Sequence, residues 1–193
     1  MSDPLRIGFV TGATPDKWAR HWRERRREPL ELVPVTEAEQ LDGVREGSLD
    51  MALVRLPVDR GGLHCVRLYD ELQVVVASRD HLLAAADDEV STADLVDEQL
   101  VRPHPSGWTP AVEQLDWPPM SEREAIETVA AGTGIVIVAM SVARLHQRKD
   151  VVTRVVTDLE PTTIALVWPV ERDDEVTQAF VGVTKGRTAN TSR

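Results

Sequence analysis

The segment 36–56, TEAEQLDGVREGSLDMALVRL, constrains the fold of this chain more than any other stretch. A helical pattern stops at Gly47, a polar corner follows, and an apolar strand begins at Met51. Residues 5–35 already show a strand, a helix and a strand. The repeated strand–helix–strand order predicts a parallel sheet with right-handed crossovers. Open sheets of this kind bind ligands beyond the carboxyl ends of their strands, and we expect the functional residues there.

The composition is typical of a globular protein and argues against several functions. The 193 residues accommodate one large domain or two small ones, and the net charge of −10 argues against direct nucleic-acid binding, which needs clustered Lys and Arg. The single cysteine, Cys65, excludes an internal disulfide and fits a reducing compartment. No signal-peptide pattern and no membrane-length apolar run is present, so we predict a cytoplasmic protein without membrane contact.

Strands and helices alternate along the chain, which predicts the α/β class. The expected strands are 5–10, 30–35, 51–56, 63–68, 72–77, 98–102, 135–139, 151–156 and 162–168. The expected helices are 16–27, 37–46, 121–131, 142–148 and 174–183, with a short helix after Ser91 or Thr92. The expected helix caps are Thr14, Ser121 (in a capping box with Glu124) and Ser141. Residues 70–71 are predicted to form a solvated turn, and 103–119 an irregular segment rich in Pro, Gly and Trp.

The sequence pattern changes near residue 77, after five predicted strands, which suggests that the chain crosses there into a second lobe. A second crossing near residue 160 would bring the last strand and helix back to the first lobe, so we predict two lobes separated by one cleft. Lobe I is predicted to comprise residues 1–77 and 160–186, and lobe II residues 78–159. The polar tail, residues 187–193, is predicted to be disordered.

Several segments match one known family in order. They are LRIGFV at 5–10, PLEL at 29–32, REGSLDMALV at 45–54, SRDHLL at 78–83 and VAAGTGI at 129–135. Together they resemble the effector-binding domain of LysR-type transcriptional regulators, a relative of the type 2 periplasmic binding proteins. The resemblance spans about residues 5–183, and its specificity comes from the order and spacing of motifs that are individually weak.

The resemblance implies two Rossmann-like lobes with a central ligand cleft that binds a small acidic or aromatic effector, and a homodimer that uses the first helix. Members normally carry a winged helix-turn-helix and a linker helix ahead of this domain, and this sequence has neither. It is therefore either a free-standing effector domain, which its Met-Ser-Asp start favours, or a piece cut at the domain boundary. Without a DNA-reading element, a free-standing domain would signal through protein–protein contacts.

The resemblance places one ligand contact in the loop Thr11, Gly12 and Thr14, although Thr14 could simply cap the following helix. Thr36 lies at the matching end of the next strand and could bind ligand or act as a cap. The family's usual hydroxyl aligns nearer Glu37, whose carboxylate would repel an acidic ligand.

Three further candidates lie at later positions. Arg55 ends a strand and could pair with a ligand carboxylate, or form an exposed salt bridge. Arg102 and His104 lie at a strand end expected to face the cleft, in a loop whose alternative role is to bury Trp108. Thr133 could bind ligand or cap a turn.

Catalysis has little support, because the histidines lack metal-ligand spacing and no glycine-framed serine elbow is present. We predict no catalytic residue, metal or cofactor. Two alternatives remain: a degenerate interaction module that dimerises with other regulators, and an enzyme on the same scaffold with His104 as its best candidate. The basic run 17–27 could be a solvated helix face, a nucleic-acid contact, or a dimer contact with Asp173, Asp174 and Glu175 of a partner.

Overall fold

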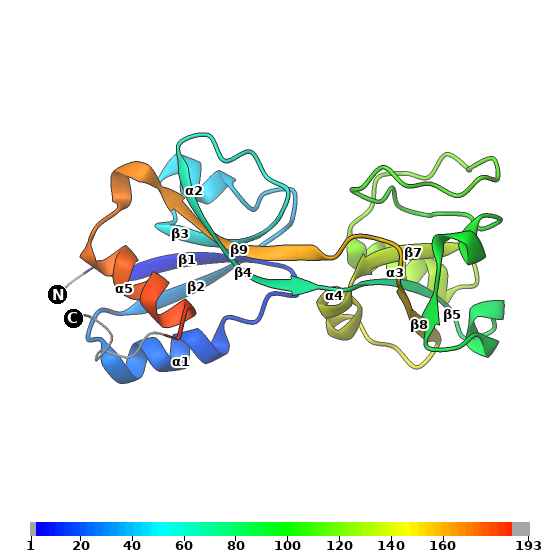
Figure 1. Ribbon diagram of the computed structural model, residues 1–193, viewed down its shortest axis with the longest axis horizontal. Coiled ribbons are helices and arrows are strands. Elements are labelled where there is room, and N and C mark those ends of the chain that lie inside the picture. Colours follow the sequence, from blue (N-terminus) through cyan, green and yellow to red (C-terminus); the bar gives the residue numbers. More distant parts are fainter. Residues whose placement is uncertain (1–2, 187–193) are drawn as a thin grey trace. The chain divides into compact units, whose positions relative to one another are not determined.

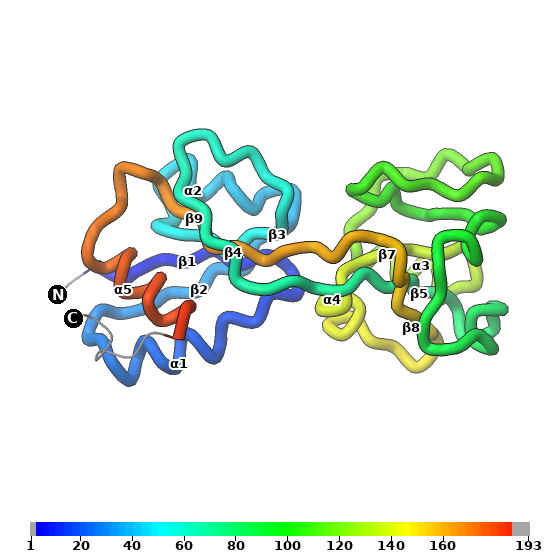
Figure 2. Tube along the Cα trace, viewed as in Figure 1, coloured from blue at the N-terminus to red at the C-terminus, as the bar shows by residue number. Residues whose placement is uncertain are grey.

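The computed structural model describes residues 3–186, which divide into two compact units (Figure 1). Within these residues, unit 1 runs up to Asp70 and resumes at Thr163, and unit 2 is Glu71–Thr162. From the sequence we expected the chain to cross from the first to the second lobe at residue 77. In the structure, residues 73–78 pair with strands of unit 2, so the boundary between the units lies after Asp70. Figure 2 shows the two crossings of the backbone, one after β4 and one before β9. The predicted tail, 187–193, lies outside the described residues.

Unit 1 contains a five-stranded sheet in the order β2-β1-β3-β9-β4. Its strands are β1 (Leu5–Val10), β2 (Leu30–Val35), β3 (Met51–Arg55), β4 (Leu63–Glu71) and β9 (Thr162–Pro169). β1 pairs in parallel with both β2 and β3, which confirms the parallel wiring predicted from the segment 36–56. β9 pairs antiparallel to β3, so the parallel run of strands β2-β1-β3 ends at β3.

Helices cover both faces of this sheet (Figure 1). They are α1 (Asp16–Arg25), α2 (Asp42–Glu46) and α5 (Glu175–Thr184). The side chains of β3 alternate between the faces, because successive residues of a strand point in opposite directions. Met51 packs in one core cluster with Trp22 of α1 and Phe180 of α5, whereas Ala52 packs in another with Val44 of α2. Burial on both faces explains the apolar run Met51–Val54 of β3.

Unit 2 is built on a four-stranded sheet in the order β6-β8-β5-β7. Its elements are β5 (Gln73–Ser78), β6 (Glu89–Val90), β7 (Ile135–Ala139), β8 (Val151–Val156), α3 (Glu122–Ala130) and α4 (Met140–Leu145), with 3-10 helices at Leu82–Ala85 and Thr92–Leu95. Val74 and Val76 of β5 pack with α3, and Val75 packs on the other face with Leu83 and Leu95. β5 is antiparallel to both β7 and β8, so only β6 and β8 pair in parallel here.

Two predicted features of the strands are wrong. Residues 98–102 form no strand and contribute only an isolated bridge between Leu100 and Ile135. The expected solvated turn at residues 70–71 is part of β4 instead, and Glu71 is buried. A polar pair inside a long strand has the same local pattern as a turn, so only its tertiary surroundings distinguish the two.

The capping box predicted for α3 is confirmed. Glu124 N–H donates to Ser121 Oγ at 3.3 Å, and Glu124 Oε2 accepts from Ser121 N–H at 2.8 Å. The prediction that Ser141 caps α4 is wrong. The helix follows β7 without a loop, its N-cap is Ala139, and Ser141 lies inside the helix. The helix expected at 37–46 begins only at Asp42, after a turn. No helix among residues 3–186 is long and apolar enough to cross a membrane.

Candidate functional site

Three strand ends meet around Arg55 in unit 1. Arg55 is the last residue of β3, and its side chain is only 4% exposed. Its guanidinium donates to the carbonyl oxygen of Thr11, just after β1, at 3.1 Å, and to Glu37 Oε2, just after β2, at 3.2 Å. The carboxyl ends of neighbouring parallel strands share one sheet edge, so the sheet itself brings these residues together.

Gln40 holds the end of β3 in place. Its Oε1 accepts from the backbone N–H of Arg55 at 2.7 Å, and its Nε2 donates to the Arg55 carbonyl at 3.2 Å. Sequence reasoning missed this buried glutamine, because a glutamine in a helical pattern suggests an exposed position. The salt bridge considered for Arg55 exists with Glu37, but it is buried and not exposed. A ligand carboxylate would therefore have to compete with Glu37 for the Arg55 guanidinium.

The two threonine loops of unit 1 have different local roles. Gly12 has φ +87°, a conformation that favours glycine, in the turn after β1. Thr14 is exposed and does not cap α1, whose N-cap is Pro15 without a side-chain hydrogen bond, so that prediction is wrong. Thr36 donates to Glu39 Oε2 at 2.7 Å and accepts from Glu39 N–H at 3.3 Å, as a cap does. Ligand contacts at these positions stay predictions.

The acidic residues considered as dimer contacts interact within their own chain. Glu175 lies 3.5 Å from the guanidinium of Arg26, which follows α1, and Asp174 caps α5 by accepting backbone N–H groups. Asp173 accepts from Trp168 Nε1 at 3.2 Å. These contacts lie inside unit 1, so the acidic side chains have roles that need no partner.

In unit 2, Arg102 joins the irregular segment to the start of α3. Its guanidinium lies 2.9 Å from Glu122 Oε1, in the first turn of the helix, and donates to the Met120 carbonyl at 3.3 Å. The Glu122 side chain is 11% exposed and that of Arg102 is 23% exposed. Arg102 is therefore already paired, and its predicted contact with ligand would compete with a partly buried ion pair.

His104 and Trp108 line one pocket of about 250 Å³, together with Trp117 and Leu115. The imidazole of His104 is neutral near pH 7, because burial, assisted by the charge of Arg102, lowers its pKa. Its Nδ1 accepts the Ser106 backbone N–H at 3.3 Å and lies 2.7 Å from Ser106 Oγ. In this tautomer Nε2 carries the proton and is a hydrogen-bond donor. Sequence reasoning found His104 and Trp108 but missed Trp117, since nothing local distinguishes it from a core tryptophan.

Two glutamines fix the wall of this pocket, and the sequence analysis found neither. Gln114 Oε1 accepts from Leu100 N–H at 2.7 Å, and its Nε2 donates to the carbonyls of Glu98 and Val112. Gln99 reciprocates by donating to the Glu113 carbonyl at 2.9 Å and accepting from Leu115 N–H at 2.9 Å. These side chains satisfy backbone groups that a strand at 98–102 would have given to a neighbouring strand.

Replacing Gln114 with leucine should destabilise unit 2 by roughly 2 kcal/mol, because three hydrogen bonds to backbone groups disappear. Urea unfolding measures the loss, and hydrogen exchange should show faster exchange at the Leu100 amide. Gln147→Leu is the matched control, since Gln147 is exposed and its side chain makes no hydrogen bond with residues 3–186; about 0.5 kcal/mol or less is expected. Equal losses of stability in the two variants would contradict a stabilising role for the Gln114 hydrogen bonds.

Thr133 is exposed in the turn between α3 and β7 and does not line the His104 pocket. Its predicted ligand contact stays a prediction. Within residues 3–186, no group of three or more His, Cys, Asp and Glu side chains is arranged to hold a metal ion. Cys65 is partly buried and packs against the core cluster on the α2 face.

Comparison with known proteins gives a family match over nearly the whole chain and a sequence relative over about half of it. A family model described as the LysR substrate binding domain matches residues 2–189. The Hca operon transcriptional activator HcaR of Escherichia coli (strain K12) is 37% identical over 95 residues, which are 47% of this chain and 32% of that protein. The matched region thus spans about a third of the length of that relative.

Solved structures show the same fold at low sequence identity. The effector binding domain of a BenM variant has a TM-score of 0.77 and 22% identity, with 97% of this chain and 98% of that chain covered. The BenM effector binding domain with its effector benzoate has a TM-score of 0.76 and 20% identity, covering 96% and 91%. An OxyR mutant of Corynebacterium glutamicum has a TM-score of 0.72 and 21% identity, covering 95% and 64%. These neighbours have the type 2 periplasmic-binding-protein-like α/β fold that was expected from the sequence.

Proposed function

The chain belongs to the LysR substrate-binding domain family, and from this premise we propose that it binds a small aromatic or acidic effector. The His104 pocket of unit 2 supplies one contact surface, and the strand ends around Arg55 in unit 1 supply another. A ligand held between the two units, as predicted from the sequence, is part of this proposal. The proposal assigns no catalytic step to the chain.

The observation that carries the proposal is the chemistry of the His104 pocket. Two tryptophans and a leucine offer flat apolar surfaces, and His104 offers a neutral Nε2–H donor beside them. Ligand sites commonly combine apolar and aromatic walls with a few polar groups that fix orientation. A volume of about 250 Å³ accommodates a single ring, so the expected ligand fragment is an aromatic ring with a hydrogen-bond acceptor.

The chemistry around Arg55 narrows the ligand class further. Glu37 already neutralises Arg55, and the Thr11 carbonyl accepts a second bond from the same guanidinium. We therefore expect the strand ends of unit 1 to favour a hydroxyl or amide group over a carboxylate, because Glu37 would repel a second anion. The predicted contacts with Thr11, Gly12 and Thr14 fit a ligand of that kind.

A thermal-shift series with benzoate and larger aromatic carboxylates and carboxamides tests the proposal. A compound present at a hundred times its Kd should stabilise the protein by about 2.7 kcal/mol and raise Tm by about 5–10 °C. His104→Phe, which keeps an aromatic ring but removes Nε2–H, should weaken binding about fivefold to tenfold. His146→Phe is the matched control and should bind normally. If no compound raises Tm, or if both variants lose binding equally, the His104 pocket is not the effector site.

The biological role is proposed from the family. We propose that effector binding acts in transcription regulation through protein–protein contacts, in the cytoplasm, as a homodimer and without direct nucleic-acid contact by this chain. A ligand shifts a conformational equilibrium only by its differential affinity for the two states, so the effector must favour one arrangement of the chain. Sedimentation measurements on the ligand series test whether binding changes the oligomeric state.

A further inference from the structure

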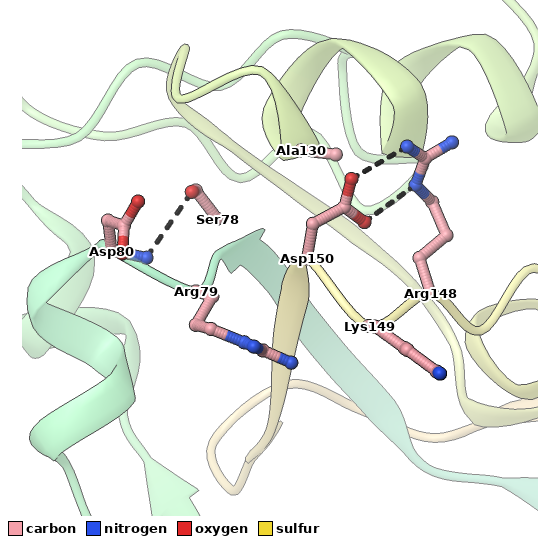
Figure 3. Close-up of a pocket in the computed structure, with 7 residues that line it drawn as sticks. All are labelled: Ser78, Arg79, Asp80, Ala130, Arg148, Lys149 and Asp150. Atoms are coloured by element: carbon pink, nitrogen blue, oxygen red, sulfur yellow. Dashed lines mark hydrogen bonds and ion pairs between the residues drawn. The ribbon is translucent and has the colours of Figure 1, made fainter.

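A second pocket of unit 2, of about 550 Å³, lies at the end of β5 and shares no lining residue with the His104 pocket. Figure 3 labels the seven residues that line it, which include three cations and two carboxylates. On a chain with a net charge of −10, three basic side chains around one concave surface are a local exception.

The two walls of this pocket are joined by the sheet. Ser78 ends β5 and pairs in register with Val151, the first residue of β8. The backbone N–H of Arg79 donates to the carbonyl of Asp150 at 2.9 Å. Because β5 and β8 pair up to Ser78 and Val151, the residues that follow β5 and precede β8 keep a fixed spacing.

One cation and one carboxylate of the pocket neutralise each other. Arg148 donates to both oxygens of Asp150, at 2.8 and 2.7 Å. The hydrogen bond from Arg148 lowers the pKa of Asp150, and the bond to Asp150 raises that of Arg148, so this pair stays charged and mutually bound. Within residues 3–186, the side chains of Arg79 and Lys149 make no hydrogen bond or ion pair. In Figure 3 the heads of both side chains point away from the Arg148–Asp150 pair, and the positive charge of Arg79 contributes only weakly to lowering the pKa of Asp150.

Ser78 supplies a neutral donor on the other side of the pocket from the heads of these two cations (Figure 3). Its Oγ accepts the backbone N–H of Asp80 at 3.3 Å, and its hydroxyl proton has no acceptor among the described residues. The Asp80 carboxylate lies beside Ser78 and away from the heads of Arg79 and Lys149 (Figure 3). The pocket therefore offers positive charge on one side, and a hydroxyl donor and a carboxylate acceptor on the other.

We propose that this pocket binds a phosphomonoester of a small hydroxylated molecule, such as a sugar phosphate. Arg79 and Lys149 hold the phosphate, which arginine can bind with two parallel N–H···O bonds and lysine as a point charge. Ser78, which lies beside Asp80, donates to an oxygen of the hydroxylated part of the ligand. Asp80 accepts from a hydroxyl of the ligand, which an isolated phosphate lacks. The volume lies in the range of small-molecule sites and exceeds what a bare phosphate needs.

Titration of the ¹⁵N-labelled full chain with ribose 5-phosphate, inorganic phosphate and sodium chloride at equal ionic strength tests the proposal. We expect saturable shifts of the amides at residues 78–80 and 148–150, with ribose 5-phosphate binding more tightly than phosphate, and no saturation with chloride. Arg79→Gln and Lys149→Gln should each weaken both phosphate ligands about tenfold. Asp80→Asn should weaken ribose 5-phosphate only.

Lys17→Gln is the control for the charge change, since Lys17 is exposed on α1 in unit 1, and it should bind as the unchanged protein does. Absence of saturable shifts at these amides would overturn the proposal. So would equal weakening by Lys17→Gln, because it would show a general charge effect. An acidic peptide that saturates the same amides when neither phosphate compound does would replace the proposed site with a protein contact. None of these outcomes depends on the His104 pocket.

Discussion

Replacing Trp22 with alanine is expected to destabilise the protein by about 4 kcal/mol, the largest effect of any substitution considered. Trp22 is completely buried between the sheet and α5, with its ring centroid 5.6 Å from that of Phe180. The substitution leaves a cavity and also removes the hydrogen bond from Nε1 to the Glu28 carbonyl at 2.9 Å. Urea unfolding followed by far-UV circular dichroism measures the loss, and hydrogen exchange should show lower protection of amides in β1 and β2.

Trp18→Ala is the matched control for this prediction. Trp18 lies on the same helix, one turn earlier, but it is only partly buried, with its ring centroid 6.3 Å from that of Tyr69. Removing a partly buried ring forfeits less apolar burial and leaves a site open to water, so we expect a loss of about 1–2 kcal/mol. A loss as large as that of Trp22→Ala would show that helix content, and not core packing, decides the stability of α1.

Replacing Gly134 with alanine should destabilise unit 2 by about 3 kcal/mol. Gly134 has φ +65°, and a Cβ there would lie 2.3 Å from the carbonyl oxygen of Gln99. That carbonyl already accepts the Ile135 N–H at 2.8 Å, so the clash cannot be relieved without breaking a bond that joins β7 to the pocket wall. Urea unfolding measures the stability, and the thermal shift with aromatic ligands should shrink, since Gln99 positions Leu115.

Gly132→Ala is the control that distinguishes the effect of backbone strain from the effect of the steric clash with Gln99. Gly132 has φ +94°, but a Cβ there would meet no atom within 4 Å. Only the strain of a positive φ remains, so the expected loss is about 1 kcal/mol and ligand binding should be unchanged. If the two glycine variants lose the same stability, the close approach of Gly134 to Gln99 has no energetic role.

Much of unit 1 could be predicted from the sequence, because its signals are local. Gly47 ends α2 in a left-handed conformation, and the apolar run at Met51 can be buried only as a strand covered on both faces. Those two features already predict the crossover into β3. The strand expected at 98–102 failed for the opposite reason: its apolar residues are buried as a strand's would be, but its backbone is bonded by Gln114, which is distant in the sequence.

The candidate sites divide in the same way. The strand ends that carry Thr11, Glu37 and Arg55 could be found, because topology places carboxyl ends of parallel strands together. That Arg55 is already neutralised by Glu37 could not be found, since it depends on side-chain directions at two chain positions far apart. The same holds for the pocket at the end of β5, where Arg79 and Lys149 come together only through the pairing of β5 with β8.

The sequence by itself determined the α/β class, the family, the parallel start of unit 1 and the buried faces of the strands, since each follows from periodicity, caps and motif order along the chain. Only the tertiary structure decided which cations are paired, which amides close the His104 pocket and where the chain crosses between units. Those features are contacts between residues far apart in sequence. The free energy of a charge or an amide depends on such neighbours, which no local pattern specifies.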